Sequence, residues 1–437
     1  MKLLDELKWR GLVSHTTDEE KLAALLDGKP INFYCGFDPT APSLHHGNLV
    51  QIILMRHLQL KGHKPYLVIG GATGLIGDPR QSGERVMNEK STVTQWAENL
   101  SKQTKRFFDF ESGNKAEIVN NLDWTNGISI IDFLRDIGKY FRVGNMLSKE
   151  TVSKRLNSEE GISYTEFSYS VMQAWDFLNL FKKYNVILQT GGQDQWGNLT
   201  AGLDLIRKKE SAEVAVLTTP IITKADGSKF GKSEGGETVW LNPDMMSPYS
   251  FYQFWFNSSD EDAINYLKIF TFLPVAEIEN IIKQHETAPH ERLAQKALAK
   301  EITLFVHGES GLDNAIATTQ FFFSNRNKDA GGDKLSKSDV EKSISEKSFY
   351  QALYSLKNEE PATANIGNNI VDCFVSAHLV QSKSEARRSI KEGGLYLNHE
   401  RITDENYNIA ENDFYYGKYA LLKKGKKNSA GLQLKLK

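Results

Sequence analysis

The sequence has little cysteine, no long apolar run and almost no net charge, and each shortage excludes a class of protein. Its 437 residues contain only two cysteines, Cys35 and Cys373, without a CxxC spacing. A disulfide framework or a cysteine-based zinc site is therefore not expected. The low cysteine content instead predicts a protein of the reducing cytoplasm. No run of roughly 18 uncharged apolar residues occurs, so no membrane-spanning helix is expected. The first ten residues carry acids and predict an amphipathic helix rather than a signal or transit peptide.

The charge is small in total but unevenly distributed. The formal net charge of −2 argues against a protein that binds nucleic acid over its whole surface. From Gln381 onwards there are twelve Lys or Arg against seven Asp or Glu, which makes this end about +5 and the remainder about −7. A basic end on an acidic body is typical of a phosphate-binding module, although a solvated tail explains the same charge.

The N-terminal half alternates apolar strands with helices. Short apolar runs at 31–36 and 65–70 predict buried strands on either side of a helix over 47–61. Such a βαβ unit implies a parallel sheet with a right-handed crossover. Ligands bind beyond the carboxyl ends of the strands in such sheets, and the loops after Cys35 and Ile69 lie there.

Further along, a capping box at Ser163 and Glu166 predicts a helix to about residue 184. A helix over 197–208 lies between predicted strands at 185–189 and 213–217. Residues 248–319 have a helical pattern, and 324–347 are polar without apolar periodicity, as in a linker. The length predicts two to four domains. The expected divisions are an α/β domain (1–225), a connection (226–247), an α-helical domain (248–323), a linker (324–348) and a small basic α+β module (349–437).

Two turns that follow strands could bind phosphate. After the first strand the chain passes Asp38 and Thr40, and a helix begins at His45 with Gly47 in its first turn. The free N–H groups and positive dipole end of such a helix suit a phosphate, although two histidines could equally cap the helix or bind a metal. The second strand ends in Gly70-Gly-Ala-Thr-Gly-Leu-Ile-Gly-Asp78, a glycine series that also occurs in dinucleotide-binding reductases.

Three further motifs carry polar side chains that suit a small ligand. Tyr169, Gln173 and Asp176 lie at i, i+4 and i+7 on one helical face, which either grips a ligand or is a solvated face. The turn from Gly192 to Asn198 places Asp194 and Gln195 before a helix, as a ribose or amino-acid pocket requires. The segment from Lys229 to Ser233 carries paired lysines that could bind a polyphosphate, or could simply be a charged loop.

Taken together and in order, these motifs resemble the tyrosyl-tRNA synthetases of the class I aminoacyl-tRNA synthetase family. His45-His-Gly-Asn48 resembles the HIGH signature of that class, and Lys229-Phe-Gly-Lys-Ser233 resembles its KMSKS signature in the KFGKS form of the tyrosine enzymes. The stretches 34–40, 169–176 and 192–198 resemble the tyrosine member. Residues 382–398 resemble its S4-type RNA-binding module. The resemblance therefore implies a Rossmann-like catalytic domain, an α-helical anticodon-binding domain and an S4-like tRNA-binding domain.

The resemblance also assigns roles to individual positions of this sequence. The implied tyrosine-binding residues are Tyr34 and Asp176 for the phenol, Asp78, Tyr169 and Gln173 for the ammonium group, and Gln195 for the carboxyl. The implied nucleotide-binding residues are Cys35, Gly36, Asp38, Gly47, Asn48, Gly192, Asp194 and Lys232. The implied catalytic residues that meet the departing pyrophosphate are Thr40, His45, Lys229 and Lys232, with Arg85 from the loop after Pro79. The implied tRNA-binding residues are Arg387 and Arg388.

The resemblance implies an ATP-dependent, AMP-forming tyrosine–tRNA ligase that makes tyrosyl-adenylate and then charges tRNA(Tyr). ATP would be a substrate accompanied by Mg²⁺, without a protein-bound metal site. The enzyme would be a cytoplasmic homodimer without a membrane partner. One departure is Asn48, which replaces the second histidine of HIGH and could still donate to a ribose oxygen.

Three alternatives stay open at this point. A tryptophanyl enzyme would share the two class signatures but would need no pair such as Tyr34 and Asp176 to recognise a phenol. A non-catalytic RNA-binding relative could keep the fold without the chemistry. A dinucleotide-binding reductase would account only for the glycine series at 70–78.

Overall fold

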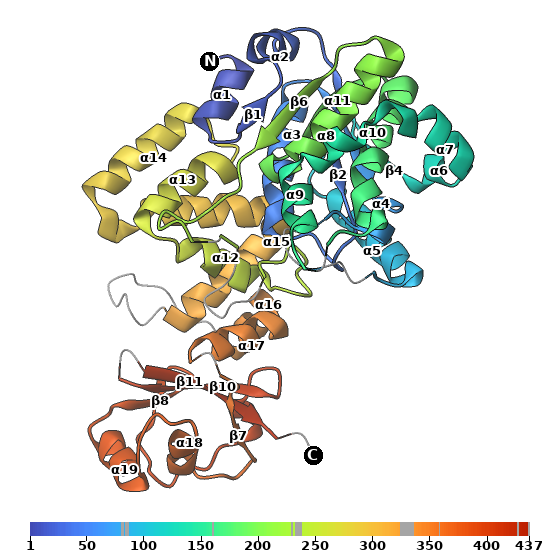
Figure 1. The fold of residues 1–437 in the computed structure, drawn as a ribbon. Coiled ribbons are helices and arrows are strands. Elements are labelled where there is room, and N and C mark those ends of the chain that lie inside the picture. The colour runs from blue at the N-terminus through green and yellow to red at the C-terminus, as the bar shows by residue number, and fades with distance from the viewer. Residues whose placement is uncertain are drawn as a thin grey trace. The chain divides into compact units, whose positions relative to one another are not determined.

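The computed structural model describes residues 1–79, 83, 87–159, 161–228, 230–231, 238–323, 336–357, 359–425 and 428–435. These form two compact units (Figure 1). The first contains the described residues of 1–233, 238–242 and 258–298, and the second contains those of 243–257 and 299–437.

The first unit is built on a six-stranded sheet in the order β1-β6-β5-β2-β3-β4. The four pairs that do not involve β1 are parallel, which confirms the predicted parallel sheet, and β1 pairs antiparallel with β6 at one edge. The central strands are almost wholly buried because helices cover both faces of such a sheet. The strands are β1 (His15–Thr16), β2 (Asn32–Phe37), β3 (Lys64–Ile69), β4 (Glu117–Asn120), β5 (Val186–Gly192) and β6 (Ala215–Thr219).

The helices of this unit include each one predicted from the N-terminal half of the sequence. They are α1 (Leu3–Trp9), α2 (Glu19–Leu26), α3 (His46–Leu60), α4 (Thr73–Ile76), α5 (Lys90–Thr104), α6 (Leu122–Thr125), α7 (Ile130–Asp136), α8 (Val143–Leu147), α9 (Glu150–Leu156), α10 (Tyr164–Tyr184), α11 (Trp196–Glu210), α13 (Asp260–Phe270) and α14 (Val275–Thr287). Among the described residues, none of the helices in either unit is both long and apolar enough to cross a bilayer.

Successive side chains at the end of β2 face two different helices, α10 and α3. Tyr34 belongs to the same apolar cluster as Trp175 and Phe177 of α10. The next residue, Cys35, points to the other face, where its thiol contacts the Gln51 amide of α3 at 3.9 Å. Because successive strand residues face opposite sides of a sheet, one strand end presents groups toward both α10 and α3.

The start of α10 differs in detail from the predicted capping box. The Ser163 hydroxyl accepts from the Glu166 N–H at 3.3 Å, as expected. The Glu166 carboxylate does not return to the cap, because it pairs with Arg155 at 2.9 Å in a fully buried ion pair. Arg155 also donates to the carbonyls of Gly161 and Gly83, at 2.9 and 2.7 Å. This buried pair therefore joins α9 to the helix that carries Tyr169 and Asp176.

The second unit ends in the expected small α+β module. Its sheet has the order β7-β11-β10-β8-β9, in which only the pair of β7 and β11 is parallel. Its elements are α12 (Pro248–Phe256), α16 (Lys337–Ser343), α17 (Glu346–Ser355), β7 (Ala362–Ala364), α18 (Ile370–Ser376), α19 (Lys383–Lys391), β8 (Leu395–Leu397), β9 (Glu400–Arg401), β10 (Tyr419–Lys424) and β11 (Asn428–Leu434).

Two features of the C-terminal half differ from the sequence-based expectation. The expected lack of helical pattern over 324–347 is wrong from 337 onwards, where α16 forms and α17 begins; residues 324–335 lie outside the described residues. The helical region is also divided, since α13 and α14 belong to the first unit and α12 to the second, and α15 (Leu293–Phe323) runs through the boundary with a kink at Gly308. The domain boundaries given above therefore stay a prediction.

Candidate active site

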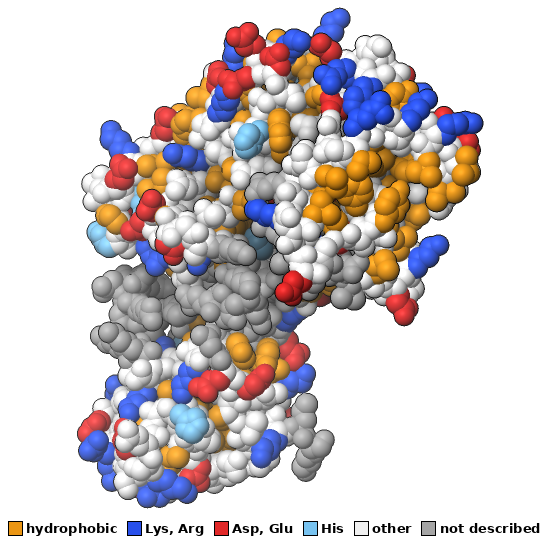
Figure 2. All heavy atoms as spheres, viewed as in Figure 1, with side chains coloured by type: hydrophobic (Ala, Val, Ile, Leu, Met, Phe, Trp, Pro, Cys, Tyr) orange, Lys and Arg blue, Asp and Glu red, His pale blue; other side chains and the backbone are white. Residues whose placement is uncertain are grey.

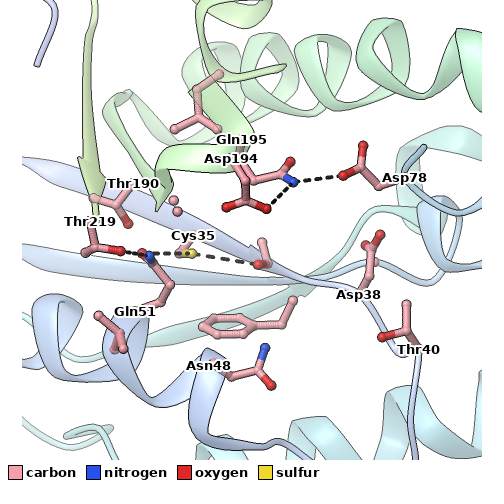
Figure 3. Close-up of a pocket in the computed structure, with 18 of the residues that line it drawn as sticks. Cys35, Asp38, Thr40, Asn48, Gln51, Asp78, Thr190, Asp194, Gln195 and Thr219 are labelled. Carbon is pink, nitrogen blue, oxygen red and sulfur yellow. Dashed lines mark hydrogen bonds between the residues drawn. The ribbon is translucent and has the colours of Figure 1, made fainter. Parts of the chain in front are cut away.

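A cavity of about 610 Å³ opens beyond the carboxyl ends of β2, β3 and β5 in the first unit (Figure 3). Ligands are expected at this place in a parallel sheet. The cavity brings together most of the residues singled out from the sequence. They are Tyr34, Cys35, Gly36, Asp38, Thr40, His45, Gly47, Asn48, Asp78, Tyr169, Gln173, Asp176, Gly192, Asp194 and Gln195.

The other predicted site residues are placed elsewhere or are not described. Arg85, Lys229 and Lys232 lie outside the described residues. Arg387 and Arg388 are exposed on α19, in the second unit.

The deep end of the cavity contains a phenol hydroxyl without a partner. Tyr34 is 2% exposed, and among the described residues its hydroxyl finds no hydrogen-bond partner. Burial raises the pKa of Tyr34 well above its usual value, and the nearby Asp176 adds to this. An unpaired buried hydroxyl costs about 1–3 kcal/mol, so this group is set up to pair with a polar atom that enters the cavity.

Asp176 faces the same end of the cavity and is held by two side-chain donors. Its carboxylate accepts from the Trp124 indole N–H at 2.7 Å and from the Asn121 amide at 3.0 Å. Burial raises the pKa of Asp176 to about 7, although these two hydrogen bonds oppose the shift. A buried carboxylate held in this way can accept a further hydrogen bond from a hydroxyl group.

Sequence reasoning missed both of these donors. Asn121 lies at the end of β4, where it also accepts from the Ala72 N–H at 2.7 Å, and Trp124 lies on the short helix α6. Neither belongs to a motif that was recognised. Their place after β4 would have been a signal, because functional groups collect beyond the strand ends of a parallel sheet, but the sequence analysis did not predict this strand.

Two carboxylates form the middle of the cavity. Asp38 accepts from the Tyr169 hydroxyl at 2.7 Å and from the Thr73 hydroxyl at 2.6 Å. Asp78 accepts from the amides of Gln195 and Asn198, at 2.8 and 3.0 Å. Figure 3 shows Asp78 and Asp38 on the same side of the cavity, with Gln195 between Asp78 and Asp194. Two acids beside a polar cavity favour a cationic group such as an ammonium.

The N-terminus of α3 forms the outer part of the cavity and is capped by its own signature residues. The His45 Nδ1 accepts from the Gly47 N–H at 3.0 Å, and the Asn48 Oδ1 accepts from the His45 N–H at 3.1 Å. The capping reading is therefore correct, but it does not exclude a catalytic role. Because Nδ1 accepts, the neutral ring carries its proton on Nε2, which can donate to an anion. Burial lowers the pKa of His45 and favours this neutral form.

A line of polar groups on the α3 side of the sheet suits a ribose. The Gln51 amide bridges the Cys35 thiol, at 3.9 Å, and the Thr219 hydroxyl, at 2.5 Å (Figure 3). Gln51 and Thr219 were not predicted, because a helix residue and a distant strand end meet here only in the folded chain. Burial raises the pKa of the Cys35 thiol to about 12, so it remains protonated and can donate.

The comparisons with known proteins agree with this geometry. Residues 26–324 match the family model of class I tRNA synthetases for tryptophan and tyrosine, and residues 355–430 match a C-terminal domain of the tyrosine–tRNA ligase type. The chain is 52% identical to a tyrosine–tRNA ligase of Bifidobacterium longum over 431 residues, which cover 97% of this chain and 95% of the relative. This decides the family. The chain belongs to the tyrosyl-tRNA synthetases.

Further relatives of this tyrosyl-tRNA synthetase agree in sequence and in fold. A tyrosine–tRNA ligase of Streptococcus mutans is 50% identical over 429 residues, which cover 98% of each chain. A C-terminally truncated mitochondrial tyrosyl-tRNA synthetase of Coccidioides posadasii shares the fold with a TM-score of 0.64 at 33% identity, and covers 72% of this chain and 91% of its own. The tryptophanyl and reductase alternatives are thereby excluded.

Proposed function

We propose that this tyrosyl-tRNA synthetase carries out its tyrosine–tRNA ligase reaction in the cavity described above, with the roles given to its residues from the sequence. L-tyrosine reacts with ATP to give tyrosyl-adenylate and pyrophosphate, and the tyrosyl group then passes to the 3′ end of tRNA(Tyr). The observation that supports this assignment best is the buried Tyr34 hydroxyl, which has no partner among the described residues and lies in the same cavity as the Asp176 carboxylate. A phenol between them would donate to Asp176 and accept from Tyr34.

The ammonium group of the substrate would lie among Asp78, Tyr169 and Gln173. Since the Tyr169 hydroxyl donates its proton to Asp38, its oxygen is left as an acceptor for an N–H of the ammonium. Asp78 supplies the negative charge. The Gln195 amide donates to Asp78 at 2.8 Å and to Asp194 at 3.3 Å, so binding of the substrate carboxyl would replace the longer bond.

In the activation step the tyrosine carboxylate attacks the α-phosphate of ATP in line, and no covalent enzyme intermediate is required. Catalysis then comes from positioning and from cations and N–H donors that meet negative charge as it develops. The Nε2–H of His45 and the hydroxyl of Thr40 would donate to the phosphates, and Lys229, Lys232 and Arg85 would neutralise the departing pyrophosphate. Mg²⁺ would enter bound to ATP. The ribose would lie against Cys35, Gly36, Gly47, Asn48, Gly192 and Asp194.

Asn48 can take the ribose contact despite its departure from the HIGH signature. Its Oδ1 is occupied by the cap bond to His45, which leaves the amide NH₂ to donate to a ribose oxygen. Arg387 and Arg388 on the exposed face of α19 would contact the tRNA backbone. The proposed location is the cytoplasm, where ATP and tRNA are available.

The phenol assignment predicts opposite effects of Tyr34→Phe on stability and on specificity. Because the substitution removes an unpaired buried hydroxyl, the free energy of unfolding without ligand should rise by about 1 kcal/mol. The preference for tyrosine over phenylalanine in kcat/KM should fall roughly tenfold or more, because a partner of the substrate hydroxyl is lost. Urea unfolding and amino-acid-dependent ATP–pyrophosphate exchange measure the two quantities.

Tyr66→Phe is the matched control, since Tyr66 is the in-register neighbour of Tyr34 on β3 and does not line the cavity. It should leave the amino-acid preference unchanged. An unaltered preference in Tyr34→Phe would remove Tyr34 from the phenol site, and a wild-type chain without tyrosine-dependent exchange would contradict the catalytic role altogether.

We further propose that the enzyme is a homodimer and that the exposed apolar face around α7 and α8 forms its interface. Figure 2 shows hydrophobic side chains gathered over this part of the first unit. The exposed apolar side chains of the face are Ile130, Ile131, Leu134, Val143 and Leu147. An apolar cluster of this kind on a monomer surface is typical of a protein contact.

Ile131→Glu is therefore expected to convert the dimer into a monomer at micromolar concentration, because the interface would bury a charge without a partner. Ile131 is 67% exposed in the isolated chain, so the substitution should leave the fold intact. Leu60→Glu is the control, as Leu60 is 56% exposed at the end of α3, a helix that packs against β3 and α13. Sedimentation equilibrium of both variants decides the proposal, and an unchanged dimer in Ile131→Glu would refute this interface.

A further inference from the structure

The second residue of the HIGH-like signature, His46, has no role in the mechanism above, yet it contacts the KFGKS segment directly. Its ring lies edge-on to Phe230, with the ring centroids 5.5 Å apart and the planes at 85°. A Cβ added to Gly231 would lie only 1.8 Å from the His46 Nε2. The imidazole is therefore packed against the backbone of Gly231, and this contact requires a glycine.

Backbone hydrogen bonds hold the same three segments together. The His46 N–H donates to the Val239 carbonyl at 3.0 Å, and the Val239 N–H donates to the Gly231 carbonyl at 3.3 Å. Gly231 has φ +99°, a conformation that costs a non-glycine residue strain of its own. The start of α3, the strand-like residue Val239 and the Phe230–Gly231 pair thus form one connected unit.

On its other side this pair is fixed by α13. Phe230 is buried against Tyr266 and Phe270, at centroid distances of 4.8 and 5.7 Å. The Tyr266 hydroxyl donates to the Thr223 carbonyl at 3.2 Å, and Asp262 accepts from the Ala225 N–H at 2.7 Å. The segment before Phe230 is therefore fastened to α13, and among the described residues His46 and Val239 connect the Phe230–Gly231 pair to the N-terminus of α3.

We propose that His46 is a positioning residue, whose imidazole supports Phe230 and Gly231 and so aligns the KFGKS segment with the helix N-terminus where the phosphates of ATP would bind. The inference rests on the roles proposed above for Lys229 and Lys232, which flank this pair in the sequence. A catalytic group displaced by about 1 Å can lose on the order of 10²-fold in rate, so a support of this kind affects kcat. Burial lowers the pKa of His46 to about 4, which keeps the ring neutral and suited to packing against Phe230.

A first double-mutant cycle tests the contact itself. His46→Ala should lower kcat of tyrosine-dependent pyrophosphate exchange by about 10- to 100-fold and change the KM for tyrosine by less than about twofold. Gly231→Ala should also lower kcat, through backbone strain and through the clash with His46. In the double variant the clash is gone, so the combined loss should be smaller than the product of the two single losses by about fivefold or more.

Gly62→Ala is the matched control for the strain. Gly62 has φ +100°, nearly the value of Gly231, but a Cβ there would have no neighbour within 4 Å, and the residue lies in the turn after α3. Gly62→Ala should keep the exchange rate, and its combination with His46→Ala should show only the loss of His46→Ala. Strictly multiplicative losses of His46→Ala and Gly231→Ala would overturn the inference.

A second cycle separates positioning from general packing. If His46 acts through the lysine-bearing segment, His46→Ala should lower kcat by less than about a further threefold in a Lys232→Ala background. General damage to the packing would instead lower kcat by the same factor in the wild-type and Lys232→Ala backgrounds. The same factor in both backgrounds would refute the proposal. Tyrosine binding and thermal unfolding report whether each variant is folded, and His46→Ser, which also removes the ring, takes the place of His46→Ala if the latter is not.

Failure of this inference is distinguishable from failure of the proposed roles. A Lys232→Ala enzyme with the wild-type rate would contradict the role of the lysine. Multiplicative cycles in an enzyme that depends on Lys232 would contradict only the role of His46.

Discussion

Replacing Lys232 by alanine is expected to lower kcat for tyrosyl-adenylate formation by about 10²- to 10³-fold, the usual effect of removing one group that stabilises transition-state charge. The KM for tyrosine should change less than about twofold, because the proposed lysine contact is made to the pyrophosphate as charge develops on it and not to the amino acid. Pre-steady-state measurement of adenylate formation gives both values.

Lys224→Ala is the control for Lys232→Ala, since Lys224 precedes the KFGKS segment and does not line the cavity. It should leave adenylate formation within about twofold of wild type. A raised KM for tyrosine with an unaltered kcat in Lys232→Ala would show that the lysine contributes to ground-state binding, and would contradict the role proposed here.

Asp176→Ala is expected to weaken tyrosine binding by about 10³-fold. The substitution removes the acceptor for the substrate phenol, and it also removes the acceptor of one N–H of the Asn121 amide and of the indole N–H of the half-buried Trp124. The lost charged hydrogen bond and the two orphaned donors together cost about 4 kcal/mol, which corresponds to roughly three powers of ten. Equilibrium dialysis with tyrosine measures the effect, and retention of wild-type affinity would exclude Asp176 from the pocket.

Asp176→Asn provides the folded, isosteric control and a test by pH. Since the pKa of Asp176 is raised to about 7 by burial, the folded chain keeps a proton that the unfolded chain loses above about pH 4. The wild-type free energy of unfolding should therefore fall as the pH rises from about 4 to about 7, and this fall should be smaller in Asp176→Asn. Equal pH dependence of the two proteins would contradict the raised pKa.

The sequence predicted those parts of the fold that local patterns specify. The strands β2 and β3 and the helix α3 between them follow from short apolar runs bounded by proline and glycine, and α10 follows from its cap at Ser163. The strand β1 was missed because two residues carry no pattern. The helix α16 was missed because its polar composition hid the apolar spacing of Val340 and of Ile344, which caps its C-terminus, although Ser336 caps its N-terminus as a capping box predicts.

The candidate site was predictable to the extent that its residues lie within contiguous motifs. Tyr34, Tyr169 and Asp176 were found because each lies in a recognisable stretch, and the cavity brings them together. Asn121 and Gln51 were not found, because their positions depend on how β4 and α3 meet other elements. A single sequence contains the spacing within an element but not the register between elements, so such partners emerge only from the folded chain.

The bonds around Asp176 set a condition for any redesign of this pocket toward amino acids with an apolar para substituent. Replacing Tyr34 and Asp176 alone would make room for such a substituent. It would also leave an N–H of Asn121 and the indole N–H of Trp124 without their acceptor, beside an apolar group. Each stranded donor costs about as much as the new contact gains. Mutant libraries designed to change the amino-acid specificity should therefore vary these four positions together. Libraries that vary only Tyr34 and Asp176 should yield enzymes of low activity.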